Sequence, residues 1–253
     1  MNRSASFRRV RRMAFAVLVL VFCAGCVSID QTLTLNADGS ADVELRYELS
    51  NALREKFTRV FDLADDLAAA SGKDPMSPAA RRAAFPYITD EKELKKMFTA
   101  YKEWGVRVST LEVNRIGNMD KVTLEYTVPD LRVLAKTAFF AQQSFSVNRT
   151  RDGDYEFKLS LGSRSADALP DLSDPNVQDI LRPMLEGFRV VSTIKTPGKI
   201  IYTSSPRATA RMAVWSYDFS QDLNALANLQ RRVQRLTIAG RGLNMRGLSY
   251  EAP

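Results

Sequence analysis

Apolar and polar residues alternate on both sides of a short Asp-Gly turn near the start of the chain. Ile29, Gln31, Leu33 and Leu35 share one face of the first run, and every second residue from 41 to 49 is apolar in the next. Period-two alternation around residues 36–40 predicts a β-hairpin. One face of that hairpin must be buried, so the sheet that contains it needs another layer of secondary structure packed against this face.

The hairpin pattern recurs twice. Residues 106–113 and 122–128 flank a turn at 117–120, and residues from 145 to 161 surround the Asp-Gly turn at 151–154. Turn residues bound the remaining apolar runs, which predict further strands. These strands are expected at 190–195, 200–203, 212–219 and 233–239.

Single helices are expected between the hairpins. Apolar residues recur at helical spacing from Leu53 to Ala68, where Asn51 is the expected N-cap and Gly72 the expected end. Asp90 is the expected cap of a second helix that runs to about residue 103 and ends at Gly105. Further helices are expected over residues 131–142, after the Asp130 cap, over 174–187, which begins Asp174-Pro175, and over 222–230.

The order of elements favours an α+β fold, with a mostly antiparallel sheet built from hairpins and amphipathic helices packed on one face. Loops are expected at residues 73–86 and 163–174. The chain shows neither an internal repeat nor a low-complexity segment. Residues 26–253 are expected to form a single domain, with 163–174 as the place where a subdivision would fall.

The first 25 residues have the layout of a secretory signal peptide. They contain five arginines and no acid, followed by an apolar run at 13–22 that is shorter than the roughly 20 residues of a membrane-spanning helix. The pair Arg8-Arg9 also fits a twin-arginine signal. Without these five arginines the formal charge falls from +7 to +2, so the basic balance gives little reason to expect nucleic acid as a partner.

Cys23-Ala24-Gly25-Cys26 resembles the lipobox of bacterial lipoproteins, with Cys23 where leucine is usual. The resemblance implies cleavage after Gly25 and acylation of Cys26 as the first residue of the mature chain. Two or more fatty acyl chains, palmitate among them, give a stable membrane anchor. Val27 and Ser28 follow in place of aspartate, which implies outer-membrane delivery with the domain on the periplasmic face. The alternative is an ordinary signal peptide or an uncleaved anchor.

Few residues offer catalytic chemistry. The chain has no histidine, which excludes Ser-His-Asp and Cys-His catalysis and histidine-ligated zinc. The mature chain would retain only the acylated cysteine, so no disulfide is expected. The carboxylates fit solvated helix faces, turns or helix starts better than metal or acid–base sites, and neither a cofactor nor a metal is expected. These carboxylates are Asp62, Asp65 and Asp66, then Asp38, Asp152 and Asp154 in turns, and Asp171, Asp174 and Asp179 near a helix start.

Aromatic residues supply the remaining binding candidates. Trp215, Tyr217 and Phe219 alternate along one strand, where core packing is the first interpretation and a lipid or glycan site the second. Phe139 and Phe140 stand among small residues and could border a cavity.

The order of lipobox, early Asp-Gly hairpin and the segment Thr196-Pro197-Gly198-Lys199-Ile200, followed by Trp215 and Asp218, resembles the LppM-like family of bacterial envelope lipoproteins. That resemblance implies an α/β domain tethered to the envelope that binds lipid or glycolipid, and it supplies no catalytic residues.

The first functional hypothesis is therefore a non-catalytic, membrane-anchored lipoprotein that binds a hydrophobic envelope ligand or a protein partner. A structural or assembly subunit, pairing through exposed hairpin edges, is the alternative. The third hypothesis is a cell-wall glycan hydrolase that uses a pair of carboxylates.

Overall fold

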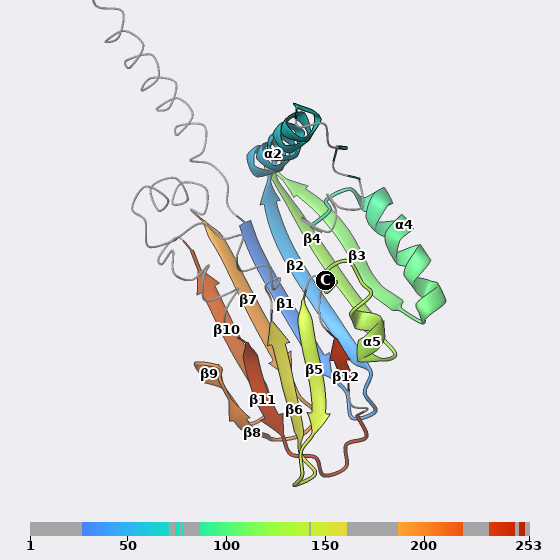
Figure 1. The fold of residues 1–253 in the computed structure, drawn as a ribbon, viewed down its shortest axis with the longest axis vertical. Helices are drawn as coiled ribbons and strands as arrows, with labels where there is room; N and C mark the ends of the chain where they lie inside the picture. Colours follow the sequence, from blue (N-terminus) through green and yellow to red (C-terminus); the bar gives the residue numbers. More distant parts are fainter. Residues whose placement is uncertain are drawn as a thin grey trace, which may run out of the picture.

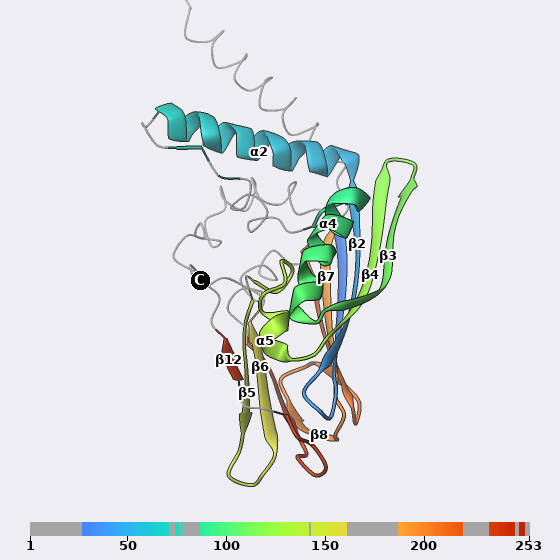
Figure 2. The ribbon, with the colours of Figure 1, turned by 90° about the vertical axis from the view of Figure 1, so that its right-hand side faces the viewer.

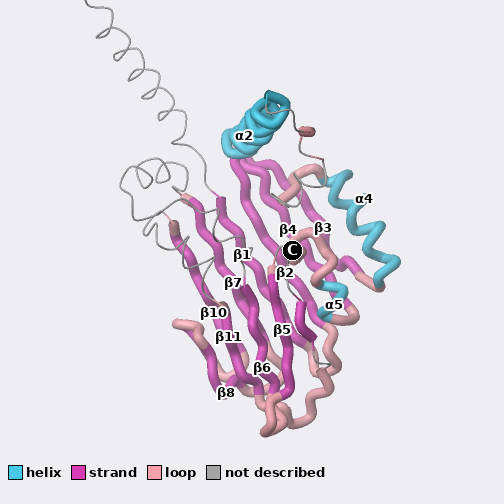
Figure 3. The backbone as a smooth tube through the Cα atoms, in the orientation of Figure 1, coloured by secondary structure: helices cyan, strands magenta, loops and turns pink. Residues whose placement is uncertain are grey.

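The computed structural model describes residues 27–70, 74, 75, 77, 87–141, 143–160, 187–219, 233–245 and 248–250. Strands dominate this part of the chain and form two sheets (Figures 1 and 3). The seven-stranded sheet has the order β3 (Arg107–Ile116), β4 (Met119–Val128), β2 (Ala41–Ser50), β1 (Val27–Leu35), β7 (Phe188–Lys195), β10 (Met212–Asp218), β9 (Arg207–Ala208). The five-stranded sheet has the order β12 (Leu248–Tyr250), β5 (Ser144–Arg149), β6 (Tyr155–Ser160), β11 (Gln234–Ile238), β8 (Ile200–Thr203).

The first hairpin forms as the sequence predicts and extends two residues further toward the N-terminus. Its register runs from Val27 opposite Leu49 to Leu35 opposite Ala41, and the inward residues of β1 are buried. β1 also pairs with β7 in parallel, whereas the other described strand pairs are antiparallel. β1 is therefore a central strand that joins the N-terminal and later parts of the sheet.

The two sheets lie as layers with a shared core. Figure 2 shows the five-stranded sheet on one side of the seven-stranded sheet, and α4 (Glu91–Tyr101) and α5 (Leu131–Leu134) on that same side. Leu33, Leu45 and Leu124 from the larger sheet belong to the same buried cluster as Phe157 and Leu236 from the smaller one. The expected antiparallel hairpins are therefore present, but a second sheet, together with few helices, covers the inner face.

The helix at 91–101 follows its predicted boundaries. Asp90 Oδ1 accepts from the backbone N–H groups of Lys92 at 2.8 Å and Glu93 at 3.1 Å, which caps α4. A 3₁₀ turn, η1 (Lys102–Trp104), then ends at Gly105 with a left-handed φ of 81°. This conformation carries little cost for glycine, which explains the end of the helix there.

The start of α2 (Asn51–Ala70) differs from the prediction. The Oγ of Ser50, not the side chain of Asn51, accepts from the backbone N–H of Leu53 at 3.2 Å. The N–H of Asn51 donates to the carbonyl of Asn118 at 2.8 Å. The last residue of β2 therefore caps the helix, because strand and helix follow each other without a loop.

The helix predicted over 131–142 is much shorter. After α5, residues 135–141 continue as turns. The backbone N–H of Ala138 donates to the Tyr101 hydroxyl at 2.9 Å, and the Thr137 hydroxyl donates to the Leu134 carbonyl at 2.8 Å. A hydrogen bond from α4 thus replaces the one that would continue the helix.

Several predictions lie outside the described residues, among them the signal peptide, Cys26, the helices over 174–187 and 222–230, and Asp171, Asp174 and Asp179. Within the described ranges, no helix combines the length and apolar character needed to span a bilayer.

Candidate functional site

A small polar cluster lies buried between the two sheets. It consists of Gln31 on β1, Gln143 just before β5, Ser192 on β7 and Gln234 at the start of β11. Gln31 and Ser192 are direct partners in the β1–β7 register of the larger sheet, whereas Gln143 and Gln234 belong to the smaller sheet and the segment before it. All four are less than one-tenth exposed.

Two hydrogen bonds within this cluster connect the sheets. Gln143 Nε2 donates to Gln31 Oε1 at 3.2 Å and to the Phe139 carbonyl at 3.0 Å. Ser192 Oγ donates to Gln234 Oε1 at 3.0 Å. Both bonds come from residues far apart in the sequence and would help to align one sheet on the other.

Three amide atoms of the cluster lack a hydrogen-bond partner: Gln31 Nε2, Gln143 Oε1 and Gln234 Nε2. An unsatisfied buried polar atom costs about 1–3 kcal/mol, so such atoms are rare in protein cores unless water or a ligand completes them. The cluster therefore offers two donor nitrogens and one acceptor oxygen to a polar group placed between the sheets. Amides and a hydroxyl do not titrate near neutral pH, so the cluster is suited to binding and not to proton transfer.

Aromatic residues lie next to this cluster. Trp215 on β10 is opposite Ser192 in the β7–β10 register. Trp215, Tyr217 and Phe219 are all buried, as are Phe139 and Phe140. The aromatic stripe is therefore part of the core, as the first interpretation of the sequence has it, and it borders the polar cluster.

Sequence reasoning did not identify the cluster. Gln31 is a visible signal, because it is the one polar residue among the inward positions of β1. Gln143 and Gln234 carry no comparable signal, since only the packing of the second sheet buries them.

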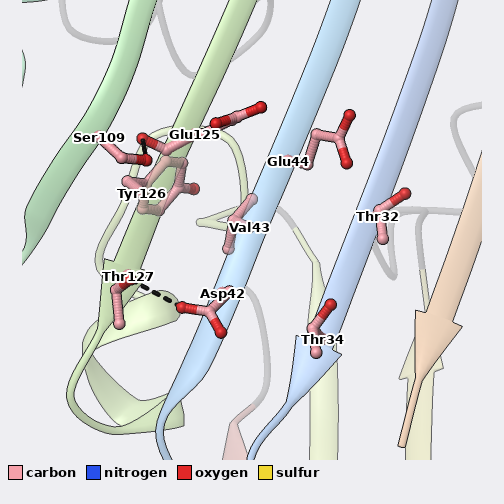
Figure 4. Close-up of a pocket in the computed structure, with 9 residues that line it drawn as sticks. All are labelled: Thr32, Thr34, Asp42, Val43, Glu44, Ser109, Glu125, Tyr126 and Thr127. Atoms are coloured by element: carbon pink, nitrogen blue, oxygen red, sulfur yellow. Dashed lines mark hydrogen bonds between the residues drawn. The ribbon is translucent and has the colours of Figure 1, made fainter.

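The outer face of the larger sheet carries a shallow depression (Figure 4). Its volume is about 240 Å³, which is below the roughly 300–1,000 Å³ of typical ligand pockets. Hydroxyl groups satisfy part of the carboxylate lining: Thr127 donates to Asp42 Oδ1 at 2.7 Å, and Thr110 donates to Glu125 Oε2 at 2.8 Å. We interpret this face as a hydrated sheet surface.

Within the described residues, the carboxylates singled out in the sequence lie in separate parts of the fold, on α2 and in turns. Asp62 and Asp66 are exposed on α2. Asp38 accepts from the Ser40 hydroxyl at 2.7 Å and its N–H at 2.9 Å, and these hydrogen bonds lower the pKa of the Asp38 carboxyl. Asp154 Oδ1 accepts from the N–H of Gly240 at 3.0 Å. Both Asp-Gly segments therefore act as turns, and the described residues contain no group of three or more metal-ligating side chains.

Asp120 is the buried acid of the described chain. Its side chain is 3% exposed and accepts from Arg115 Nε at 2.8 Å and Arg54 at 3.1 Å. The hydrogen bond from Arg115 lowers the pKa of Asp120, and the charges of both arginines act in the same direction. This ion pair links the start of α2 to the β3–β4 turn. We therefore interpret Asp120 as a residue that stabilises the fold.

Comparison with solved structures finds a weak likeness to a domain of a bacterial lipoprotein. The folded domain of Mycobacterium tuberculosis LppM, solved by NMR, aligns with 87% of this chain and 95% of that domain, at 10% sequence identity and a TM-score of 0.36. No family model and no curated protein matches the sequence. Function must therefore be argued from the residues of this chain.

Proposed function

We propose that the chain is a non-catalytic, lipid-anchored protein of a bacterial cell envelope, acylated at Cys26, that binds an amphipathic envelope molecule. Support for the anchor comes from the lipobox-like segment and from Val27, the first residue of a central strand. Consecutive Cα atoms are about 3.8 Å apart, so the acylated residue would carry the domain without a spacer. The residues after Cys26 favour the periplasmic face of the outer membrane.

The observation that supports a ligand is the set of three unpartnered amide atoms in the polar cluster. A lipid or glycolipid has a polar group that could complete these hydrogen bonds and an apolar part suited to the surrounding core. The cluster lacks an ionisable group, which supports a binding role without catalysis.

The anchor is tested by the intact mass of protein extracted from membranes, beside a Cys26→Ser variant. We expect the wild-type chain to begin at Cys26 and carry acyl chains, and the variant to lack them. An unmodified wild-type chain would contradict the anchor.

Ligand binding is tested by native mass spectrometry of the purified protein. We expect a co-extracted small molecule that is lost in Gln31→Leu and Gln234→Leu. Thr32→Val is the matched control, because Thr32 neighbours Gln31 but belongs to the opposite face of β1. An acylated chain that holds no small molecule and crosslinks to an envelope protein would instead favour the assembly role.

A further inference from the structure

The proposed anchor point, the start of α2 and the β3–β4 turn all lie at one end of the seven-stranded sheet. Val27, the residue after Cys26, pairs with Leu49, and α2 begins at Asn51 two residues later. The N–H of Asn51 donates to the carbonyl of Asn118 in the β3–β4 turn. Neighbouring strands are about 4.8 Å apart, so the anchor point, the start of α2 and this turn lie close together. Figure 2 shows α2 and the β3–β4 turn at the same end of the molecule.

The β3–β4 turn exposes a large apolar side chain. Ile116 is the last residue of β3 and is 59% exposed. Arg115 beside it and Arg54 on α2 share the single carboxylate of Asp120, and both guanidinium side chains are about half exposed or more. These three charged groups sum to one positive charge. An isoleucine at this position can insert among acyl chains, while the neighbouring arginine side chains keep their charged ends at the lipid headgroups.

The direction of α2 is also consistent with a membrane at this end of the sheet. The helix has 20 residues and runs across the strand direction, as Figure 2 shows. Its sequence has apolar residues at helical spacing, and its described side chains at Arg54, Glu55, Thr58 and Arg59 are exposed. If the strands stand upright on a bilayer, α2 runs parallel to the bilayer surface, and its exposed polar and charged side chains would lie near the lipid headgroups.

We propose that this end of the sheet rests on the phospholipid bilayer, with Ile116 inserted between lipids and α2 lying along the surface. The proposal rests on the lipid anchor of the proposed function. The lipid anchor is the reason to expect lipid at this surface. Acyl chains on Cys26 would hold Val27 one residue from the membrane, so the surface around Val27 meets lipid before any other partner.

The chain offers a matched control for Ile116. Ile201 on β8 is 58% exposed, which is nearly the same fraction, but β8 lies at the opposite end of the molecule (Figures 1 and 2). In the mature chain the acylated Cys26 would be the only native cysteine, so an introduced cysteine would be the only free thiol. Ile116→Cys and Ile201→Cys can each be labelled with an environment-sensitive fluorophore in the full-length, lipidated protein.

The labelled proteins are reconstituted into vesicles of phosphatidylethanolamine and phosphatidylglycerol that contain lipids spin-labelled on the acyl chain. We expect loss of most of the fluorescence at position 116 and an unchanged signal at position 201. Equal quenching, or none at either position, in a chain whose mass shows acylation would overturn the orientation and leave the anchor intact. A mass without acyl chains would remove the anchor and the orientation together.

A second measurement uses the unmodified chain. Photoactivatable phospholipids in the same vesicles should crosslink to peptides that contain residues 51–70 or 115–119 and not to peptides that contain residues 200–203. Crosslinks that favour residues 200–203 would contradict the proposed orientation even if a labelled variant failed to fold.

Discussion

The side-chain amide of Gln143 donates to the side-chain oxygen of Gln31 over 3.2 Å and joins the segment before β5 to the central strand β1. The bond between Ser192 and Gln234, at 3.0 Å, does the same for β7 and β11. Hydrogen bonds are directional and apolar contacts are not. These two bonds therefore favour one alignment of the sheets among the many that apolar burial alone would allow.

Loss of either glutamine should weaken the alignment of the two sheets. We expect Gln31→Leu and Gln143→Leu each to lower the free energy of unfolding by about 1 kcal/mol, because each leaves a buried partner unsatisfied. The double variant should cost less than the sum by about 0.5 kcal/mol or more. Urea unfolding of the four proteins measures this coupling, and additive losses would show that the two amides act independently.

The Asp120 ion pair should make stability depend on pH in acid. Asp120→Asn is expected to cost about 1–2 kcal/mol at neutral pH, less than a fully buried pair because both arginines are exposed. The folded-state pKa of Asp120 is lowered, so its contribution is fully present above the unfolded pKa of about 4 and is lost as pH falls through the folded value.

The difference in unfolding free energy between wild type and Asp120→Asn should therefore be constant above about pH 5 and shrink below about pH 4. Thermal unfolding at several pH values measures it. A difference that grows in acid would contradict the assigned direction of the pKa.

Gly240 lies where the chain after β11 crosses the β5–β6 turn. A Cβ at this position would be 1.8 Å from the carbonyl oxygen of Gly153, which is backbone and cannot rotate away. We expect Gly240→Ala to cost at least about 3 kcal/mol, at the upper end of overpacking effects.

Gly117→Ala is the control for Gly240→Ala. Gly117 has a left-handed φ of 61°, but no atom lies within 4 Å of an added Cβ. This variant should cost only about 1–2 kcal/mol from backbone strain. Equal losses for the two variants in chemical unfolding would refute the close approach at Gly240.

The Tyr101 hydroxyl should hold the turns after α5 in place. Its oxygen accepts from the N–H of Ala138 at 2.9 Å, so Tyr101→Phe leaves that N–H without this acceptor. We expect a loss of about 1 kcal/mol, together with faster amide exchange at Ala138. Unchanged exchange at this amide would mean that another acceptor replaces the hydroxyl.

Sequence patterns predicted the elements that depend on neighbouring residues. Alternation and an Asp-Gly turn located β1 and β2 to within two residues, and the Asp90 cap with Gly105 located α4. The patterns failed to predict where an element ends when residues distant in the sequence take its backbone hydrogen bonds. The helix expected after Asp130 ends after four residues because a hydroxyl from α4 takes the N–H of Ala138.

The sequence by itself determined the local hairpins, the Asp90 and Asp130 helix caps and the short distance between Cys26 and the first strand, because these depend on residues adjacent in the chain. Only the tertiary structure decided that the strands divide into two sheets and that β1 pairs in parallel with β7. It also decided which polar residues are buried, since Gln143 and Gln234 look ordinary until the second sheet covers them. Burial depends on contacts between distant segments, and no local pattern records those contacts.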